Sequence, residues 1–163
     1  MTADFCADQS GVLQVNASLC DGTGSPAVKA ANYYRWTSPQ ATSQTYSIYV
    51  TYQLPATFNG FSNDDTVKLT GRVDNITNAT VSYEMYKSVG GTITACGTET
   101  TVAGAGAGSA NTWYTVGVNG NESTGCSFSS SAASGFVIFK INVKANSNAN
   151  AYVSTLNFVT TGR

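Results

Sequence analysis

The stretch Tyr46-Ser-Ile-Tyr-Val-Thr-Tyr-Gln-Leu54 decides the fold class. Large apolar residues stand at every second position from 46 to 54, and most positions between them are polar. A period of two is that of a β-strand with one face buried and the other face wet. Pro55 ends this strand, because proline cannot donate to the hydrogen-bond ladder of a sheet.

The same alternation recurs along the chain, while no window of 11 residues keeps the apolar stripe of a capped helix. The repeats predict about eight or nine strands in an all-β, antiparallel β-sandwich, with jelly-roll topology favoured at this strand count. An immunoglobulin-like sandwich is the alternative, but the Cys–Trp–Cys spacing of that fold is absent. The strong strand candidates are 46–54, 67–73, 81–85, 137–143 and 152–159, and the weaker ones are 12–19, 28–36, 92–96 and 112–118.

The 163 residues fit a single β-sandwich domain spanning 1–163, since there is no internal repeat and no linker long enough to divide the chain. Asn75 to Asn78 has the composition of a turn. Thr101 to Asn111, with its alternating Ala and Gly, predicts either a flexible loop or a flat strand close to another backbone.

Charge is scarce in this chain. Only 10% of the residues are charged and the formal net charge is −1. We therefore expect no nucleic-acid partner and no anionic membrane surface, and no run approaches the ~20 apolar residues of a membrane span. Because few like charges keep copies apart, the composition favours association into a larger object.

Four cysteines occur, at Cys6, Cys20, Cys96 and Cys126, and none is part of a C-x-x-C pair. An even count in a chain poor in charge predicts two disulfides and an oxidising compartment. Three pairings are possible. Sequence separation favours Cys6 with Cys20 and Cys96 with Cys126, and the alternative is four buried thiols.

The sequence predicts no enzyme and no cofactor. It contains no histidine, which removes the usual general base and the commonest transition-metal ligand. Most of the nine acidic residues fall in expected turns, and Glu84 is expected alone on the wet face of its strand. Asn63-Asp-Asp65 could supply oxygen ligands to calcium, but it also has the composition of an ordinary turn.

Aromatic residues are densest at Asn32-Tyr-Tyr-Arg-Trp36. In a strand, Tyr34 and Trp36 share one face and Tyr33 and Arg35 share the other. Three uses are open for these rings: packing in the core, a protein interface, or a platform on which a sugar ring stacks.

The last strand candidate is apolar on both faces. Tyr152, Leu156 and Phe158 are expected on one face, with Val153 and Val159 on the other. A single sandwich covers only one face of a strand, so these five residues form the predicted subunit interface. The alternative is that a loop of the same chain covers the strand, and Thr101 to Asn111 is the candidate for that loop.

Three segments resemble a known class of module. They are Tyr46-Ser-Ile-Tyr-Val-Thr-Tyr-Gln-Leu-Pro-Ala-Thr-Phe-Asn-Gly-Phe61, Phe136-Val-Ile-Phe-Lys-Ile141 and Ala145-Asn-Ser-Asn-Ala-Asn-Ala-Tyr-Val-Ser-Thr-Leu-Asn-Phe158. Together they are similar to the jelly-roll modules of tailed-phage head fibres, decoration proteins and tail fibres. The resemblance implies a structural role on a particle or fibre, as an oligomer.

The first functional hypothesis is therefore a structural or assembly protein: a virion decoration or fibre module, or the subunit of an extracellular filament. Its expected partners are other copies of itself and a capsid, tail or filament protein, and its expected location is the virion or the extracellular space. The alternative is a carbohydrate-binding or adhesin module, whose partner is a surface glycan.

Overall fold

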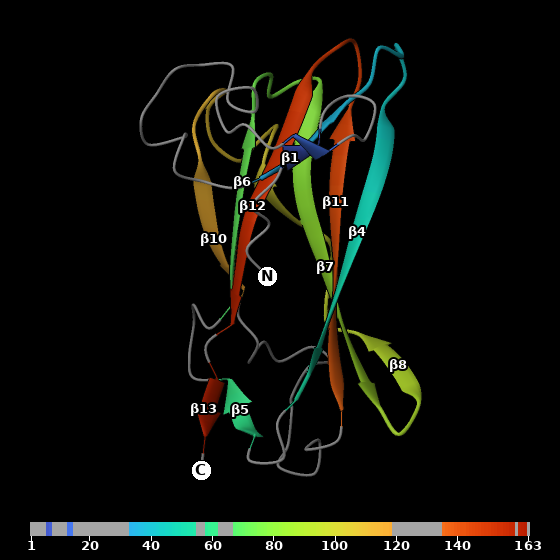
Figure 1. Ribbon diagram of the computed structural model, residues 1–163, viewed down its shortest axis with the longest axis vertical. Coiled ribbons are helices and arrows are strands. Elements are labelled where there is room, and N and C mark those ends of the chain that lie inside the picture. Colours follow the sequence, from blue (N-terminus) through green and yellow to red (C-terminus); the bar gives the residue numbers. More distant parts are fainter. Residues whose placement is uncertain are drawn as a thin grey trace.

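The protein is an all-β sandwich (Figure 1). The computed structural model describes residues 33–54, 67–118 and 135–158, together with the backbone of four short strands outside these ranges. The described residues contain no helix, and so none that is long and apolar enough to cross a membrane.

Nine strands form the two sheets of the sandwich, as expected. The first sheet has the order β10-β6-β12-β3, and the second has the order β4-β11-β7-β8, with β9 also paired to β7. All pairings are antiparallel. The bounds are β3 (Tyr34–Thr37), β4 (Gln44–Gln53), β6 (Val67–Val73), β7 (Ala79–Val89), β8 (Thr92–Ala95), β9 (Thr100–Ala103), β10 (Tyr114–Val118), β11 (Phe136–Ala145) and β12 (Asn150–Phe158).

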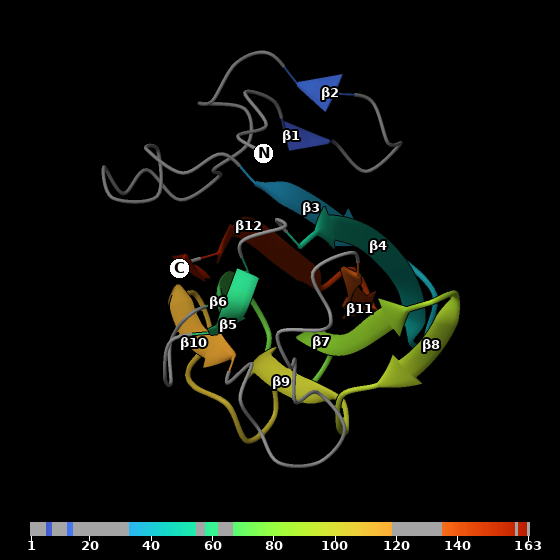
Figure 2. The same cartoon turned by 90° about the horizontal axis from the view of Figure 1, so that it is seen from below.

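The topology is that of a jelly roll. Apart from the β7, β8 and β9 run, each sandwich strand is followed by one in the opposite sheet: β3 to β4, then β6, β7, and later β10, β11 and β12. The chain therefore winds around a common core, which leaves β12 between β3 and β6 and β11 between β4 and β7 (Figure 2). Two interleaved antiparallel sheets connected in this way, here of four and five strands, define the double Greek key of the jelly roll.

Two further strand pairs lie outside the sandwich sheets. They are β1 (Cys6–Ala7) with β2 (Leu13–Gln14), and β5 (Phe58–Phe61) with β13 (Thr160–Gly162). The strands expected from the sequence do not include residues 58–61, where the structure nevertheless has β5. A strand near the chain's other end pairs with it, and local composition contains no sign of such a partner.

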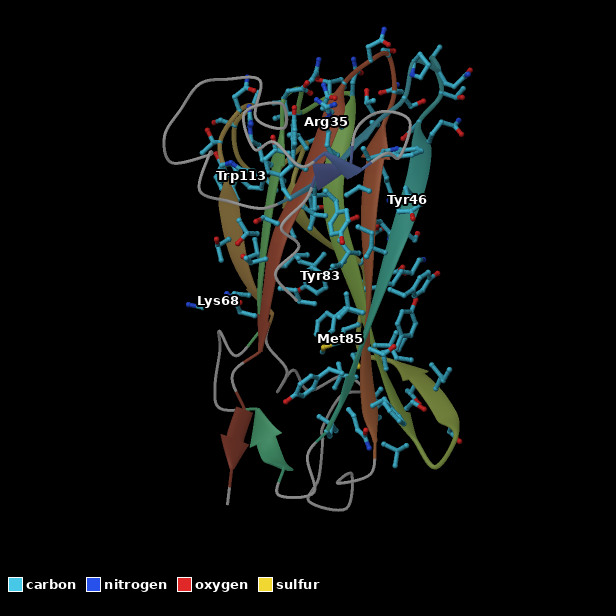
Figure 3. All side chains as sticks on the ribbon, in the orientation of Figure 1. Arg35, Tyr46, Lys68, Tyr83, Met85 and Trp113 are labelled. Atoms are coloured by element: carbon cyan, nitrogen blue, oxygen red, sulfur yellow. The ribbon has the colours of Figure 1, made fainter. Side chains whose placement is uncertain are left out.

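The core follows the period-two pattern. Inward residues of β11 are almost fully buried, including Phe139 at 0% exposure, and they meet Leu69 and Val73 from β6. Tyr83 and Met85 of β7 point between the two sheets (Figure 3). Alternation thus places apolar side chains in one layer between the sheets, where close packing and burial stabilise the fold.

The segment rich in Ala and Gly begins as a strand and continues as a tight loop. Val102 and Ala103 of β9 are buried, and a bridge between Gly104 and Ala107 closes the turn that follows. Gly108 has a φ of +92°, and a Cβ there would lie only 2.2 Å from the ring of Tyr114. The flat-strand interpretation is therefore correct for 100–103, and the loop interpretation for the residues after it.

The expected turn at Asn75–Asn78 connects β6 to β7 across the sandwich. The Asn75 side-chain Oδ1 accepts hydrogen bonds from the backbone N–H groups of Thr77 (2.9 Å) and Asn78 (3.1 Å). Asparagine is common in turns because its side chain can satisfy nearby backbone donors in this way.

Cys96 is disulfide-bonded, and the side chain of its partner lies outside the described residues. The pairing with Cys126 therefore remains a prediction. We expect a non-reducing protease digest, analysed by mass spectrometry, to contain one peptide pair joining Cys96 to Cys126. A Cys20–Cys96 peptide in the same digest would contradict this pairing.

Gly71 interrupts the apolar series of β6 for a steric reason. A Cβ at this position would lie 2.9 Å from Cγ1 of Val81 and 3.2 Å from Cγ1 of Val102. The absence of a side chain thus lets these two valines of the opposite sheet approach the β6 backbone.

We expect Gly71→Ala to lower the free energy of unfolding by about 1–3 kcal/mol, the usual cost of overpacking a core. Urea denaturation measures this loss. The double variant Gly71→Ala/Val81→Ala is the control, because removing the Val81 methyl groups makes room for the new one. Its loss should be smaller than the sum of the two single losses, and strict additivity would contradict the proposed clash.

Candidate functional site

One outer surface of the sandwich carries a connected group of polar side chains. The pleat turns Ser47 of β4, Asn142 of β11 and Ser82 of β7 outward in one row across the sheet. In the next row, Tyr49, Lys140 and Glu84 lie side by side. With Glu99, which precedes β9, seven residues form what we call the polar face: Ser47, Ser82, Glu84, Glu99, Lys140, Asn142 and Lys144.

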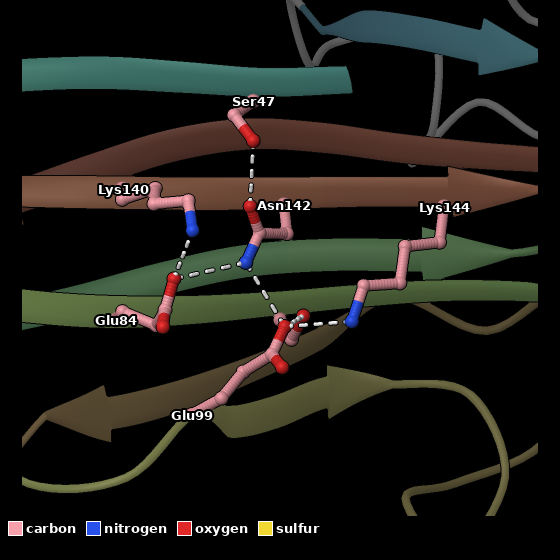
Figure 4. A network of polar contacts seen from close by, with 7 residues as sticks. Ser47, Glu84, Glu99, Lys140, Asn142 and Lys144 are labelled. Atoms are coloured by element: carbon pink, nitrogen blue, oxygen red, sulfur yellow. Dashed lines mark hydrogen bonds and ion pairs between the residues drawn. The ribbon is translucent and has the colours of Figure 1, made fainter. Parts of the chain in front are cut away.

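Asn142 is the centre of this network (Figure 4). Its Oδ1 accepts a hydrogen bond from Ser47 Oγ at 2.8 Å. Its Nδ2 donates to Glu99 Oε1 at 2.9 Å and to Glu84 Oε2 at 3.3 Å. Only 3% of Asn142 is exposed, so these bonds satisfy a buried amide that would be costly to leave unpaired.

Each carboxylate of the polar face is paired with a lysine. Lys140 Nζ lies 2.5 Å from Glu84 Oε2, and Lys144 Nζ lies 2.9 Å from Glu99 Oε1. Ser82 Oγ also donates to Glu99 Oε1, at 2.5 Å. Two carboxylates balance two ammonium groups, so the polar face as a whole has no net charge.

These contacts keep both carboxylates ionised. For Glu99, burial is the largest single influence and raises the pKa. The hydrogen bonds from Ser82, Lys144 and Asn142 outweigh it and lower the pKa to about 2. For Glu84, the hydrogen bond from Lys140 is the largest influence and lowers the pKa against the opposing effect of burial.

Exposed aromatic and apolar side chains border the polar face. Tyr49 is 64% exposed and lies directly opposite Lys140 in the register of β4 and β11. Farther along the same surface, Phe136 of β11 and Ile93 of β8 are exposed in a row that also contains Ser88. Tyr49 therefore stands where the polar part of this surface meets its apolar part.

The aromatic cluster at 33–36 does not form an exposed platform. Tyr33 is 2% exposed and packs against Trp113 and Tyr152, with ring centroids 5.8 and 5.4 Å away. Tyr34 and Trp36 are half-buried and pack against the main core. Among the three uses left open by the sequence, the structure supports core packing for these rings.

The predicted interface on β12 is wrong for its first residues, because the chain covers both faces of the strand itself. Val153 is 2% exposed and belongs to the core between the sheets. Tyr152, on the other face, is 7% exposed under Tyr33 and Trp113, and the Arg72 guanidinium lies 4.8 Å from the centre of its ring. Neither residue is available to a second subunit.

Leu156 was also placed on the wrong face. A β-bulge between Val153 and Leu156 inserts an extra residue, so Val153 lies opposite Gly71 while Leu156 lies opposite Leu69. Both therefore face the core, because the bulge reverses the alternation. The side chains of Phe158 and Val159 lie outside the described residues.

Other predicted sites fall partly outside the described chain. Asn63-Asp-Asp65, the calcium candidate, lies there, as do the side chains of Cys6, Cys20 and Cys126. Within the ranges that are described, no group of three or more His, Cys, Asp or Glu side chains could hold a metal ion.

The sequence pattern does not predict that Glu84 and Glu99 accept hydrogen bonds from the same Asn142 amide. Alternation does place Lys140, Asn142 and Lys144 on the wet face of their strand, and it does the same for Glu84. The contact with Glu99 depends on β9 folding back onto β7, where Ser82 lies opposite Thr101. No local pattern reports that pairing.

No family model matches the chain, and no curated protein matches it. Among solved structures, it is similar to TmCBM61 in complex with β-1,4-galactotriose (TM-score 0.45, 10% identity, 75% of this chain and 67% of the other). It is also similar to CBM28, a carbohydrate-binding module specific for non-crystalline cellulose (TM-score 0.43, 15% identity, 72% and 73%). A third similarity is to infectious bursal disease virus, Gx strain (TM-score 0.21, 10% identity, 80% and 41%).

At these identities, and with TM-scores below 0.5, none of the three similarities bears on what this chain binds. The jelly-roll topology rests on the strand order itself. The resemblance to phage fibre and decoration modules stays a prediction at the level of family.

The low pKa of Glu99 makes stability depend on pH. Folding favours the ionised carboxylate, whose pKa is about 2 in the folded chain against an ordinary value of 4.5. Its contribution to stability is therefore complete above about pH 5 and is lost as the pH falls towards 2. We expect the melting temperature to drop over this window, and to drop less in Glu99→Gln than in the wild type. A pKa of 4 or higher for Glu99, measured by NMR titration, would refute this account.

Proposed function

We propose that this chain is a non-catalytic carbohydrate-binding module, and that the polar face together with Tyr49 binds a neutral glycan. One observation carries the proposal: an exposed aromatic ring stands in register with a polar network that its own hydrogen bonds hold in place. The other contacts of the site support this pairing.

A sugar presents two kinds of surface, and this site offers a match for each. Its ring carbons form an apolar face that can stack on the Tyr49 ring, which is 64% exposed. Its hydroxyl groups both donate and accept hydrogen bonds. Glu84 Oε1 and Glu99 Oε2 receive no hydrogen bond from a described residue, so both can accept one from a hydroxyl group.

Preorganisation supports the same proposal. Asn142, Glu84 and Glu99 are fixed by mutual contacts, so binding has little side-chain entropy to remove from them. A sheet surface with fixed polar groups also suits an extended chain ligand, because successive rows lie at regular spacing along the strands.

The balance of charge favours a neutral ligand over an acidic one. Each carboxylate is already paired with a lysine at 2.9 Å or less. An acidic glycan would have to compete with Glu84 and Glu99 for the two ammonium groups, and it would meet their repulsion. A neutral glycan makes hydrogen bonds without breaking either ion pair.

The acidities of the two carboxyl groups favour binding over hydrolysis. A glycosidase needs one carboxylic acid with a raised pKa to protonate the leaving group. Here the pKa of Glu99 is about 2 and the pKa of Glu84 is also lowered. Neither group is a proton donor at neutral pH, which supports a non-catalytic role.

The disulfide at Cys96 supports an extracellular location for such a module. A structural role on a particle or filament is the second candidate. The predicted subunit interface on β12 was an argument for this structural role, and the burial of Tyr152 and Val153 removes that argument. What favours it now is the edge of β4, which is uncharged and has no partner among the described strands.

The proposal is tested by titration calorimetry with soluble neutral oligosaccharides of the cello-, galacto-, manno- and xylo- series. We expect at least one series to bind, and Tyr49→Ala to weaken binding about tenfold or more, which corresponds to about 1.4 kcal/mol. Tyr46→Ala is the matched control, because Tyr46 is a 54% exposed tyrosine of the same strand on the opposite face. For an oligosaccharide short enough to occupy a single polar face, the affinity of Tyr46→Ala should equal that of the wild type.

Oligogalacturonate, an acidic glycan, tests the predicted preference for neutral ligands. We expect it to bind more weakly than the neutral oligosaccharides. Absence of binding to every neutral series at millimolar concentration would refute the proposed function. Equal losses in Tyr49→Ala and Tyr46→Ala would move the site away from the polar face.

A further inference from the structure

The outer edge of β4 is free among the described strands. β4 stands at the end of its sheet and, within the part of the chain that the structure describes, pairs only with β11. The Leu54 N–H donates to the Gly135 carbonyl at 2.9 Å, so even-numbered residues of this segment bond towards β11. The backbone N–H and C=O groups of residues 45, 47, 49, 51 and 53 therefore point to the free edge.

This edge lacks the features that usually prevent pairing. Gln44–Gln53 is ten residues long and contains no charged residue, no proline and no glycine. The other edge strands of the sandwich are shorter: β3, β8 and β9 have four residues each and β10 has five. Edge strands are normally blunted by shortness, charge, proline or bulges, so a long uncharged edge is suited to accept another strand.

The sequence of β4 is also self-complementary about Tyr49. At equal distances on the two sides stand Ile48 and Val50, Ser47 and Thr51, and Tyr46 and Tyr52. An antiparallel pair related by a two-fold axis at Tyr49 would bring each of these residues opposite its counterpart in the second strand. Aromatic residues would then face aromatic ones, β-branched residues β-branched ones, and hydroxyls hydroxyls.

We propose that two copies of this chain associate through β4, paired antiparallel about a two-fold axis at Tyr49. Cross-strand pairs of these kinds stabilise sheets. The proposal concerns association of the sugar-free protein, so it does not depend on the proposed function.

Several side chains of β4 remain exposed, and this supports a second copy of the chain as the partner of the free edge. Tyr46 is 54% exposed although it points to the inner side of its sheet, where Trp36 stacks on it with ring centroids 5.4 Å apart. Ile48, Val50 and Tyr52 on the same side are only half-buried. A second β4 would cover these side chains, and a formal net charge of −1 per chain gives little repulsion between copies.

The joined sheets would place both polar faces on the same side. A two-fold axis perpendicular to the sheet keeps outer faces together, so Tyr49 of each copy would lie between the two polar faces. Two linked sites would raise the avidity for a long glycan without any new contact to the sugar.

Sedimentation velocity in the absence of sugar tests the pairing. We expect the wild type to be a dimer at about 50 μM, and Thr51→Pro to dimerise at least tenfold more weakly. The Thr51 N–H points to the free edge, so proline removes a donor to the second copy and leaves the β4–β11 hydrogen bonds in place. A wild type that is monomeric at 200 μM overturns the proposal, as does a folded Thr51→Pro variant that dimerises like the wild type.

A pair of charge variants tests the register and does not depend on how well proline is tolerated. In the proposed pairing, position 45 of one copy faces position 53 of the other, and Thr45 and Gln53 are both exposed. Thr45 lies opposite Lys144, and both variants carry the same T45E change, so any effect on Lys144 is common to the two. T45E/Q53E opposes like charges at both ends of the pairing, whereas T45E/Q53K opposes unlike charges. We expect the dissociation constant of the first variant to be about tenfold higher than that of the second. Equal constants, or the reverse order, overturn pairing about Tyr49.

Discussion

The register of β11 is the constraint on which the rest of this structure depends. All ten of its residues are paired with β4 on one side and with β7 on the other. Because side chains alternate between faces, a slip of one residue would expose Val137, Phe139, Ile141 and Val143 and would bury Lys140 and Lys144. Hydrophobic burial on the inner face thus sets the position of every polar group on the outer face.

The polar face can be understood as a consequence of that register. Asn142 stands between Ser47 and Ser82 because β4, β11 and β7 are aligned in this register. This position brings its amide within hydrogen-bond distance of Glu84 of β7 and of Glu99, which precedes β9. Its burial is tolerated because every bond it needs is made nearby. A rigid inner layer therefore supports an ordered outer layer, which is the condition for binding without a large entropic cost.

The other sheet shows how a fold can cover an apolar strand without a second subunit. The bulge in β12 keeps Val153 and Leu156 on the core side, and the loop before β10 brings Trp113 over Tyr152. The strand is apolar on both faces, as the sequence indicates. The inference of an external partner fails at Tyr152 and Val153, because the core buries Val153 and because Tyr33 and Trp113, 39 or more residues away in the chain, cover Tyr152.

The amino-acid sequence by itself determined the class of fold, most of the strands and the orientation of their side chains, because alternation is a local property with a period of two. Alternation along the sequence also places Lys140, Asn142 and Lys144 on one face of their strand, opposite the apolar face, and the sequence contains the near-palindrome of β4. The pairing of β5 with β13, the bulge that turns Leu156 inward, and the approach of Glu99 to Glu84 were decided only by the tertiary structure. Each of these depends on which distant strands become neighbours, and that choice is made by the packing of the whole core.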